Sequence, residues 1–410
     1  MSGSIKLKHA SGNGVIISAP SSNPAADRTL TLPSDADGVI AKTDSSGNLT
    51  VAGDLNTSNI NGGQISNRNL IINGAMNIAQ RGTSSTSSSY ATLDRFRLAV
   101  ANTDQAAYTQ KQVSDSPDDF SQSYEFDVTT AETSLDSNEY AFIGHRIEAQ
   151  NLQRVKANQV TLSFYVKAYQ TGTYVINIYQ SDGNIQITKT YTISQSGTWE
   201  KKTLTFAANT GTQPNNDNGL GWEIAWVMAA GSGVTSSDST SWGTYSDAGF
   251  AFGQGVNVLS STDNYFKITG VQLEVGSVAT DFEHRSFGQE LALCKRYFQT
   301  SFTSNPSTTN TDNSGLVLFG GGRTGDSTSF LGGSYVQLSP AMRSAPTVTT
   351  FDVATPRNTN KCHRHTYGFT GSNDQPVTLT DVNINSFVVR SDSGNSANGI
   401  IYHWKCEAEL

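Results

Sequence analysis

The sequence predicts an all-β protein built from several parts. Hydrophobic residues make up 36% of the chain and charged residues 15%, and both values are below those usual for globular proteins. Serine, threonine, glycine and asparagine fill the difference, and these residues favour turns and strands over helix interiors. Short segments of alternating apolar and polar residues, separated by turn residues, recur along the 410 residues. This rhythm is typical of β-sandwiches.

Residues 1–66 are predicted to form short strands rather than a domain with its own core. Ser4–Lys8, Val15–Ser18 and Thr29–Pro33 alternate in polarity and are separated by turns rich in glycine or proline. Segments this thin cannot bury a core alone, and identical chains around a threefold axis are an economical supply of neighbours. We therefore expect a short N-terminal β-stalk in a homotrimer. The alternative is a flexible tail.

Residues 67–286 are predicted to form one jelly-roll-like β-sandwich. Gln159–Ala168 is the clearest strand, because Val160, Leu162, Phe164 and Val166 alternate with more polar residues and are expected to point inward. The other predicted strands are Asp94–Val100, Ala107–Lys111, Tyr124–Val128, Tyr140–Ile147, Gly172–Gln180, Ile185–Ile193, Thr198–Phe206, Leu220–Ala229 and Phe266–Val275.

A short connecting helix is predicted over residues 287–299, between two β-rich regions. Ser286 and Gln289 fit a capping box, in which each side chain satisfies a free amide at a helix start. Apolar residues then recur three and four positions apart. We expect this stripe to pack at a junction, across the trimer or against the sandwich. It consists of Leu291, Cys294 and Phe298.

Residues 300–410 are predicted to form a second β-sandwich at the tip of an elongated fibre. A polar connector is followed by strand patterns with long loops rich in glycine, serine and asparagine. The terminal strand alternates strongly and should lie in the core of this domain. Its predicted strands are Gly315–Gly320, Ser334–Leu338, Thr347–Phe351, Pro376–Leu379, Ser386–Arg390 and Gly399–Trp404.

Several segments resemble bacteriophage tail fibre and tail spike proteins. The run TLTLPSDADGVIAKTDSSGNLTVAGDL is similar to their N-terminal regions. NLIINGAMNIAQRG with DRFRLA resembles the start of a tail-fibre β-sandwich, and ITGVQLEVGSVATDFEHRSFGQELALCKRYF resembles its end. These segments span roughly residues 28–299, and SPAMRSAPTVT adds a resemblance to C-terminal fibre domains. The resemblance implies a virion structural protein located in the tail, attached there through its N-terminus.

Carbohydrate-binding candidates gather within a short stretch of the predicted sandwich. Aromatic rings can stack on sugar C–H faces, and Trp242 and Tyr245 lie in a loop, where functional residues are common. Trp222 and Trp226 lie in an alternating run, so the alternative for both is burial in the core. Asp217, in a polar Asn-Asn-Asp-Asn turn, could bind hydroxyls. The same run could also offer oxygen ligands to calcium. An ordinary polar turn is the alternative, because the spacing of these ligands matches no calcium loop.

A metal site is a further candidate near the C-terminus. His363 and His365 form a His-x-His pair and would point to the same side of a strand. Copies from three chains could then ring an axis, with Cys406 and His403 as additional ligands. The alternatives are an exposed polar strand without metal and a disulfide between Cys362 and Cys406. Three widely spaced cysteines imply no disulfide framework, so we expect folding in the reducing cytoplasm of the host.

Other classes of function find no support in the sequence. Lysines and arginines form no cluster and the net charge is −8, which argues against nucleic-acid binding. No apolar run is long enough to insert into a membrane, and no apolar segment follows Lys6 and Lys8 as a signal peptide would require. Phosphate loops, nucleophile elbows and zinc-protease motifs are absent. We expect no enzymatic activity and no cofactor.

The expected function is host recognition during adsorption by a phage tail fibre. Its N-terminus would bind other tail proteins, and its distal domain would contact a host receptor, above all a surface polysaccharide. Several weak sites on three chains would bind with useful avidity. One alternative is a tail spike that depolymerises polysaccharide, although the long β-helix repeat of such spikes is not seen. The other is a purely structural fibre without receptor binding.

Overall fold

The computed structural model describes residues 4–8, 12, 14–18, 67–320, 333–365, 371–391 and 399–410. The chain divides into two compact units, Met1–Thr57 and Ser58–Leu410. In the first unit, β1 (Ser4–Lys8) and β2 (Gly14–Ser18) pair antiparallel, which confirms both predicted strands. The strand predicted at Thr29–Pro33 lies outside the described residues.

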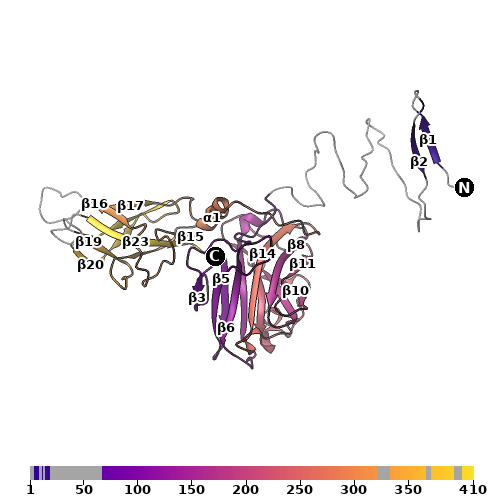
Figure 1. Ribbon diagram of the computed structural model, residues 1–410, viewed down its shortest axis with the longest axis horizontal. Helices are drawn as coiled ribbons and strands as arrows, with labels where there is room; N and C mark the ends of the chain where they lie inside the picture. Colours follow the sequence, from indigo (N-terminus) through magenta and orange to yellow (C-terminus); the bar gives the residue numbers. More distant parts are fainter. Residues whose placement is uncertain are drawn as a thin grey trace. The chain divides into compact units, whose positions relative to one another are not determined.

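The second unit contains a β-sandwich of two six-stranded sheets, which confirms the predicted fold class (Figure 1). The first sheet has the order β13 (Gly243–Thr244), β10 (Ile185–Ile193), β9 (Gly172–Gln180), β12 (Leu220–Ala230), β7 (Tyr140–Glu148) and β4 (Phe96–Ala101). The second sheet has the order β11 (Glu200–Phe206), β8 (Val160–Ala168), β14 (Tyr265–Val275), β6 (Ser123–Thr130), β5 (Ala107–Val113) and β3 (Ser84–Ser85). The connections between these strands contain short 3-10 helices at Ala149–Leu152, Ser232–Val234, Asp247–Gly249 and Val258–Ser260.

One apolar core fills the space between the two sheets. Alternate residues of each strand point into it, as period-2 strands require. In β8 the predicted inward residues Val160, Leu162, Phe164 and Val166 are all buried in this core. Each predicted sandwich strand corresponds to an observed strand, although the two-residue strands β3 and β13 were not predicted.

The two ends of the sandwich sequence meet in a buried hydrogen-bonded clamp. The Asn69 side chain donates to the Val271 carbonyl at 3.1 Å and accepts from the Leu273 amide at 3.1 Å. A Cβ at Gly74 would lie 2.1 Å from the Val271 oxygen, so only glycine fits there. Asn73 Nδ2 donates to the Asp94 carbonyl at 2.9 Å. The two segments whose sequences resemble the start and the end of a tail-fibre β-sandwich therefore meet and close this sandwich.

The α-helix α1 (Phe287–Lys295) begins at the predicted capping box but ends earlier than predicted. Ser286 accepts from the Gln289 amide, and the Gln289 side chain accepts from the Ser286 amide. The helix stops at Lys295 because Phe298–Thr300 forms strand β15, which pairs with the last strand. Among the described residues, no helix is long and apolar enough to cross a membrane.

The remaining strands form two sheets around a second core. The central strand of the larger sheet is β23 (Gly399–Glu407). It pairs with β15, β16 (Val317–Gly320), β18 (Thr347–Phe351) and β19 (Lys361–His365). The last strand of this sheet, β20 (Gly371–Pro376), pairs with β19. The smaller sheet has the order β17 (Gly333–Gln337), β22 (Ser386–Arg390) and β21 (Thr378–Thr380). Phe387 and Val389 of the smaller sheet pack with Ile400 and Tyr402 of the larger one. This confirms the predicted second β-sandwich.

Candidate functional site

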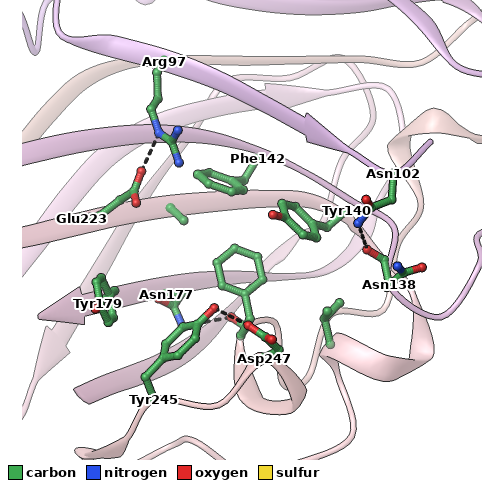
Figure 2. Close-up of a pocket in the computed structure, with 13 residues that line it drawn as sticks. Arg97, Asn102, Asn138, Tyr140, Phe142, Asn177, Tyr179, Glu223, Tyr245 and Asp247 are labelled. Atoms are coloured by element: carbon green, nitrogen blue, oxygen red, sulfur yellow. Dashed lines mark hydrogen bonds and ion pairs between the residues drawn. The ribbon is translucent and has the colours of Figure 1, made fainter. Parts of the chain in front are cut away.

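A cavity of about 540 Å³ lies on the outer face of the first sheet, beneath the loop that follows β12 (Figure 2). The pairing of four strands explains where it forms. One row across the sheet places Arg97, Gly144, Ala225 and Asn177 on neighbouring strands β4, β7, β12 and β9. The small residues Gly144 and Ala225 thus lie between the polar residues Arg97 and Asn177. The row spans three strand spacings, or roughly 14 Å between the outer strands.

Ala225 lies on the floor of the cavity, and its neighbour Gly144 on β7 is covered by other side chains. A Cβ at position 144 would lie 3.0 Å from Glu223 Oε1, 3.0 Å from Phe142 and 3.3 Å from Arg97 Cγ. Such contacts are tighter than van der Waals packing normally allows. Glycine at 144 therefore leaves room for the Arg97 side chain to cross β7 toward Glu223.

Aromatic rings border the cavity on two sides. Tyr140 and Phe142 of β7 pack with Phe250 of the loop, with ring centroids 5.3 to 5.9 Å apart. On the other side, Tyr179 of β9 meets Tyr245 of the loop edge-on at 5.0 Å. Half-buried tyrosines of this kind present an apolar ring face and a polar hydroxyl to the same ligand. Figure 2 shows both aromatic groups around the floor.

A charged cluster forms one end of the cavity. Arg97 Nε donates to Glu223 Oε1 at 2.6 Å. The same oxygen lies 3.2 Å from Arg146 Nε, and Arg146 Nη2 donates to Glu223 Oε2 at 3.4 Å. Glu223 is therefore held by two guanidinium groups, which fixes its position. The two terminal nitrogens of Arg97 have no hydrogen-bond partner among the described residues and remain available to a ligand, although the guanidinium lies 5.2 Å from the Phe142 ring centroid.

The loop that follows β12 forms one wall of the cavity, and hydrogen bonds within this loop hold its side chains in position. Tyr245 donates its hydroxyl to Asp247 Oδ1 at 2.8 Å, and burial, followed by this carboxylate, raises the Tyr245 pKa above its ordinary value. Beside it, the Asn102 side chain donates to the Asn138 carbonyl at 2.9 Å. The cavity thus combines ring faces with hydroxyl, amide, guanidinium and carboxylate groups, which is the mixture that binds a sugar.

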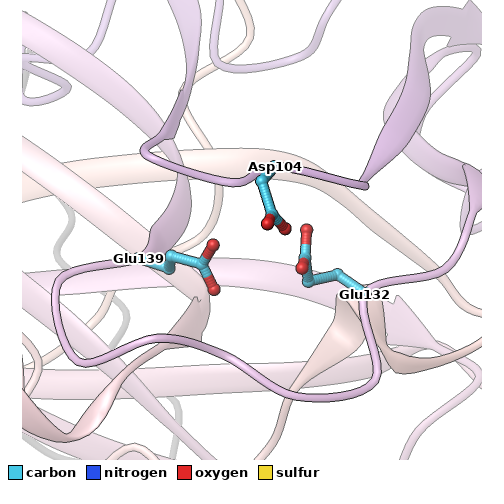
Figure 3. A group of neighbouring side chains, drawn as sticks. All are labelled: Asp104, Glu132 and Glu139. Atoms are coloured by element: carbon cyan, nitrogen blue, oxygen red, sulfur yellow. The ribbon is translucent and has the colours of Figure 1, made fainter.

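Three carboxylates converge at Asp104, Glu132 and Glu139 (Figure 3). One oxygen of each lies within 4.8 Å of the others, and the two glutamates are 2% exposed. Oxygen donors of this type suit a hard cation such as Ca²⁺. Glu132 also accepts the Gln105 and Ala106 amides at 3.0 and 2.9 Å, so its carboxylate orders this loop by itself.

The sugar-binding role predicted for Trp222 and Trp226 is wrong. Trp222 is 3% exposed and Trp226 is 0% exposed, because both lie at inward positions of β12 and belong to the sandwich core. The Trp222 indole donates to Gln180 Oε1 at 3.2 Å. Neither ring has a free face for a ligand, and burial, the alternative derived from the sequence, is what the structure shows.

The other carbohydrate-binding candidates differ in their surroundings. Tyr245 lines the cavity, but Trp242 does not. The half-buried Trp242 ring packs on Trp222 at 5.7 Å, and its indole donates to the Ala207 carbonyl at 2.8 Å. Asp217 lies in an exposed turn, where its carboxylate accepts the Gly219 amide at 2.9 Å. Asp217 therefore serves as an ordinary turn residue, away from the cavity.

The predicted metal ligands do not assemble in the described part of the chain. His363 is buried on β19, and its Nδ1 lies 2.7 Å from Asn373 Oδ1. The side chain of His365 lies outside the described residues. Cys362 and Cys406 are free, buried thiols, which rules out the disulfide alternative here. Burial raises the pKa of Cys362 to about 11, so this thiol is a poor ligand at neutral pH.

The His403 side chain is held by ring packing and by hydrogen bonds to protein groups. Its ring stacks on Phe302 at 3.9 Å, with Nδ1 2.9 Å from Ser301 Oγ and Nε2 3.2 Å from the Asp312 carbonyl. The imidazole is fully buried, and burial, followed by the nearby Arg357, lowers its pKa to about 4.

We expect the neutral His403 to make the protein less stable in acid. Between pH 6.5 and about 4 the unfolded chain takes up a proton that the folded imidazole does not, so the free energy of unfolding falls by roughly 3 kcal/mol. His403→Asn should show a shallower decline than the wild type when stability is measured from pH 7 to pH 4.5. His284→Gln, at an exposed histidine, is the control. Parallel curves for His403→Asn and wild type would contradict this assignment.

The predicted junction residues pack within their own chain. Cys294 of α1 and Phe298 of β15 are buried, and the Arg81 guanidinium lies 3.9 Å from the Phe298 ring centroid. Leu291 is half-buried. The expectation that Phe298 extends a helical stripe is wrong, because it lies on a strand. The large apolar residues of α1 that are exposed are instead Phe287 and Leu293.

Sequence reasoning missed most of the cavity. Arg97, Asn177 and Glu223 are single polar residues in alternating strands, where an outward polar residue is the ordinary pattern. One available signal was the pair Tyr140 and Phe142, two aromatic residues at successive outward positions of a strand that also carries inward apolar residues. An aromatic outward stripe of this kind indicates a covered or ligand-binding face.

No protein-family model and no curated protein matches the sequence. Solved structures show distant likenesses. The enzymatically active domain of tailspike protein 4 from bacteriophage CBA120 is 15% identical with a TM-score of 0.29, and the match covers 50% of this chain but only 21% of that one. A family 11 carbohydrate-binding module from Clostridium thermocellum, in complex with a β-1,3-1,4-mixed-linked tetrasaccharide, is 11% identical with a TM-score of 0.26, over 50% of this chain and 99% of the module. The baseplate tripod of bacteriophage Tuc2009 is 14% identical with a TM-score of 0.23, over 54% of this chain and 59% of that one. At these TM-scores the likenesses assign neither a family nor a function.

Proposed function

We propose that the chain is a bacteriophage tail fibre that binds a host-surface saccharide through the cavity on its first sheet. The observation that carries this proposal is the cavity itself, where two aromatic groups flank a floor of small residues bordered by Arg97 and Asn177. The resemblance of several segments to tail fibres supports the virion role. On this proposal the protein is a homotrimer that attaches to the tail through its N-terminal region, and it binds without catalysing a reaction.

The saccharide site of this proposal lies in the sandwich of residues 67–286, not in the distal domain favoured by the sequence. The cavity has both requirements of a sugar site, half-buried aromatic rings along its border and converging polar groups. Weak binding at each cavity is sufficient, because three chains in one fibre and several fibres in one virion add avidity.

We expect Tyr179→Ala to weaken saccharide binding by roughly tenfold, because a single aromatic contact at a binding site commonly contributes 1–2 kcal/mol. Tyr179 faces the cavity and contacts Tyr245. The measurement is the affinity of the full chain for polysaccharide extracted from the host surface, with folding verified by thermal melting.

Two further tyrosines separate the possible outcomes. Tyr169→Ala removes an exposed ring that does not line the cavity and should bind as the wild type does. Tyr335→Ala removes an exposed ring of β17, in the C-terminal sheets. Loss of binding in Tyr335→Ala alone would place the receptor site in the distal domain and contradict the proposal.

A depolymerase is the second candidate, because two carboxylates line the cavity and glycoside hydrolysis uses such a pair. In this structure Glu223 is held by two arginines and Asp247 by the Tyr245 hydroxyl. Incubation of the protein with host polysaccharide should release no reducing ends. A sustained release that Glu223→Gln abolishes would establish the enzyme instead.

A further inference from the structure

One residue that lines the cavity carries a polar atom without a hydrogen-bond partner among the described residues. Asn177 lines the cavity and is 1% exposed. Its Oδ1 is buried and accepts no hydrogen bond from any described residue. A buried acceptor without a donor is unfavourable, and such atoms are usually met by water or by a ligand.

The orientation of the Asn177 amide is fixed by its neighbours. Its Nδ2 donates to Gln186 Oε1 and to the Phe250 carbonyl, both at 3.0 Å. The Gln186 Nε2 in turn donates to the Ser246 carbonyl at 2.9 Å. Backbone carbonyls can only accept, so exchanging the nitrogen and oxygen of either amide would break these bonds. The free atom of Asn177 is therefore the oxygen, and it requires a donor.

We propose that the cavity selects an uncharged, hydroxyl-rich sugar, and that Asn177 Oδ1 accepts a hydrogen bond from one of its hydroxyls. This inference rests on the proposed function and names the substrate class of the same site. Asn177 is then a specificity-determining residue, because a buried site that accepts from a hydroxyl discriminates strongly against an analogue that lacks the hydroxyl.

The charges around the cavity favour a neutral ligand over an anion. One cation, Arg97, and two carboxylates, Glu223 and Asp247, line it. Arg97 is already paired with Glu223 Oε1, and a second arginine, Arg146, contacts both oxygens of the same carboxylate. The carboxylate of an acidic sugar can only accept hydrogen bonds, and Glu223 and Asp247 at the cavity would repel it. Sugar hydroxyls can donate to Asn177 and accept from the free Arg97 nitrogens.

The small side chain of Ala225 on the cavity floor leaves space for this contact. Ala225 is the neighbour of Asn177 across the β9–β12 pairing, and Gly144 follows it on β7. A ligand lying over Ala225 is bordered by Phe142 of β7 and Tyr179 of β9, which both line the cavity. The expected ligand therefore lies across the strands, between Arg97 and Asn177.

The experiment uses a panel of neutral gluco-, galacto- and manno-oligosaccharides, with their uronic-acid and hexosamine counterparts. Affinities are measured for the full-length wild-type chain, followed by the monodeoxy derivatives of its strongest ligand. We expect a neutral oligosaccharide to bind best, and one monodeoxy derivative to bind at least tenfold more weakly. Asn177→Leu should bind the parent sugar at least tenfold more weakly and should no longer distinguish it from that derivative.

Gln186→Leu is the matched control, since it breaks the same hydrogen-bond network while the bond from Asn177 Nδ2 to the Phe250 carbonyl still orients the amide. This variant should still discriminate against the monodeoxy derivative. A preference of the wild type for uronic acids or hexosamines, or equal binding of every monodeoxy derivative, would overturn the inference and leave the proposed function standing. Both measurements are made on wild-type protein, so they hold even if Asn177→Leu misfolds. Failure of the wild type to bind any sugar of the panel and host polysaccharide would overturn both.

Discussion

Trp226→Ala is expected to destabilise the sandwich by roughly 3–5 kcal/mol, the usual loss when a buried tryptophan is truncated. The indole is completely buried and meets Phe164 edge-to-face at 5.9 Å and Phe96 at 6.3 Å. The truncation removes these contacts and leaves a cavity at the centre of the core. Since domains of this kind are stable by only about 5–15 kcal/mol, we expect a large fall in the melting temperature.

Trp226→Phe is the matched variant for this prediction. Phenylalanine keeps most of the ring contacts and removes an indole N–H that has no partner among the described residues, so it should cost clearly less than alanine. Calorimetry of the three proteins tests this order. If Trp226→Ala melted like the wild type but lost saccharide binding, Trp226 would be a surface residue of the binding site and the core described above would be wrong.

Glu409→Ala is expected to have an effect of similar size, although it changes the second-last residue of the chain. Arg95 is fully buried and forms an ion pair with Glu409, and Arg81 Nη2 reaches the same carboxylate at 2.8 Å. The Arg95 guanidinium also lies 3.5 Å from the Tyr297 ring centroid. Removal of the carboxylate leaves the buried Arg95 without a carboxylate partner among the described residues, which typically costs about 3–5 kcal/mol, whereas Arg81 keeps Asp94 and Glu407.

The neighbouring Glu407 supplies the control for this prediction. Its carboxylate is more exposed, at 36%, and lies 3.7 Å from Arg81 Nε, so Glu407→Ala should cost less than about 1 kcal/mol. Melting temperatures and amide exchange at Ala408, which donates to the Tyr297 carbonyl at 2.8 Å, separate the two variants. Equal stability of Glu409→Ala and Glu407→Ala would show that Glu409 does not secure the C-terminal segment.

Local sequence patterns predicted most strands and the start of the helix. β8 shows why, because its alternation depends only on neighbouring residues and on which face is buried. The capping box at Ser286 is likewise encoded within four residues. The end of α1 was mispredicted because Phe298 pairs with Glu407 of β23, more than a hundred residues away, and this tertiary pairing overrides the helical spacing of Phe298.

The cavity could not be derived from the sequence, since it depends on strand order and register. Arg97, Gly144, Ala225 and Asn177 become neighbours only when β4, β7, β12 and β9 pair with one another. The free oxygen of Asn177 depends further on Gln186 and on two loop carbonyls. Aromatic residues were a partial guide. Tyr245 lines the cavity, whereas Trp222 and Trp226 took inward positions of β12 and became core residues.

The central claim is that the outer face of the first sheet binds a saccharide. A crystal structure of the full chain soaked with the strongest neutral oligosaccharide tests it most directly. We expect electron density for a sugar over Ala225, with a hydroxyl within hydrogen-bond distance of Asn177 Oδ1 and a ring face on Tyr179 or Tyr140. A sugar bound to the C-terminal sheets or beside α1, with this cavity empty, would contradict it.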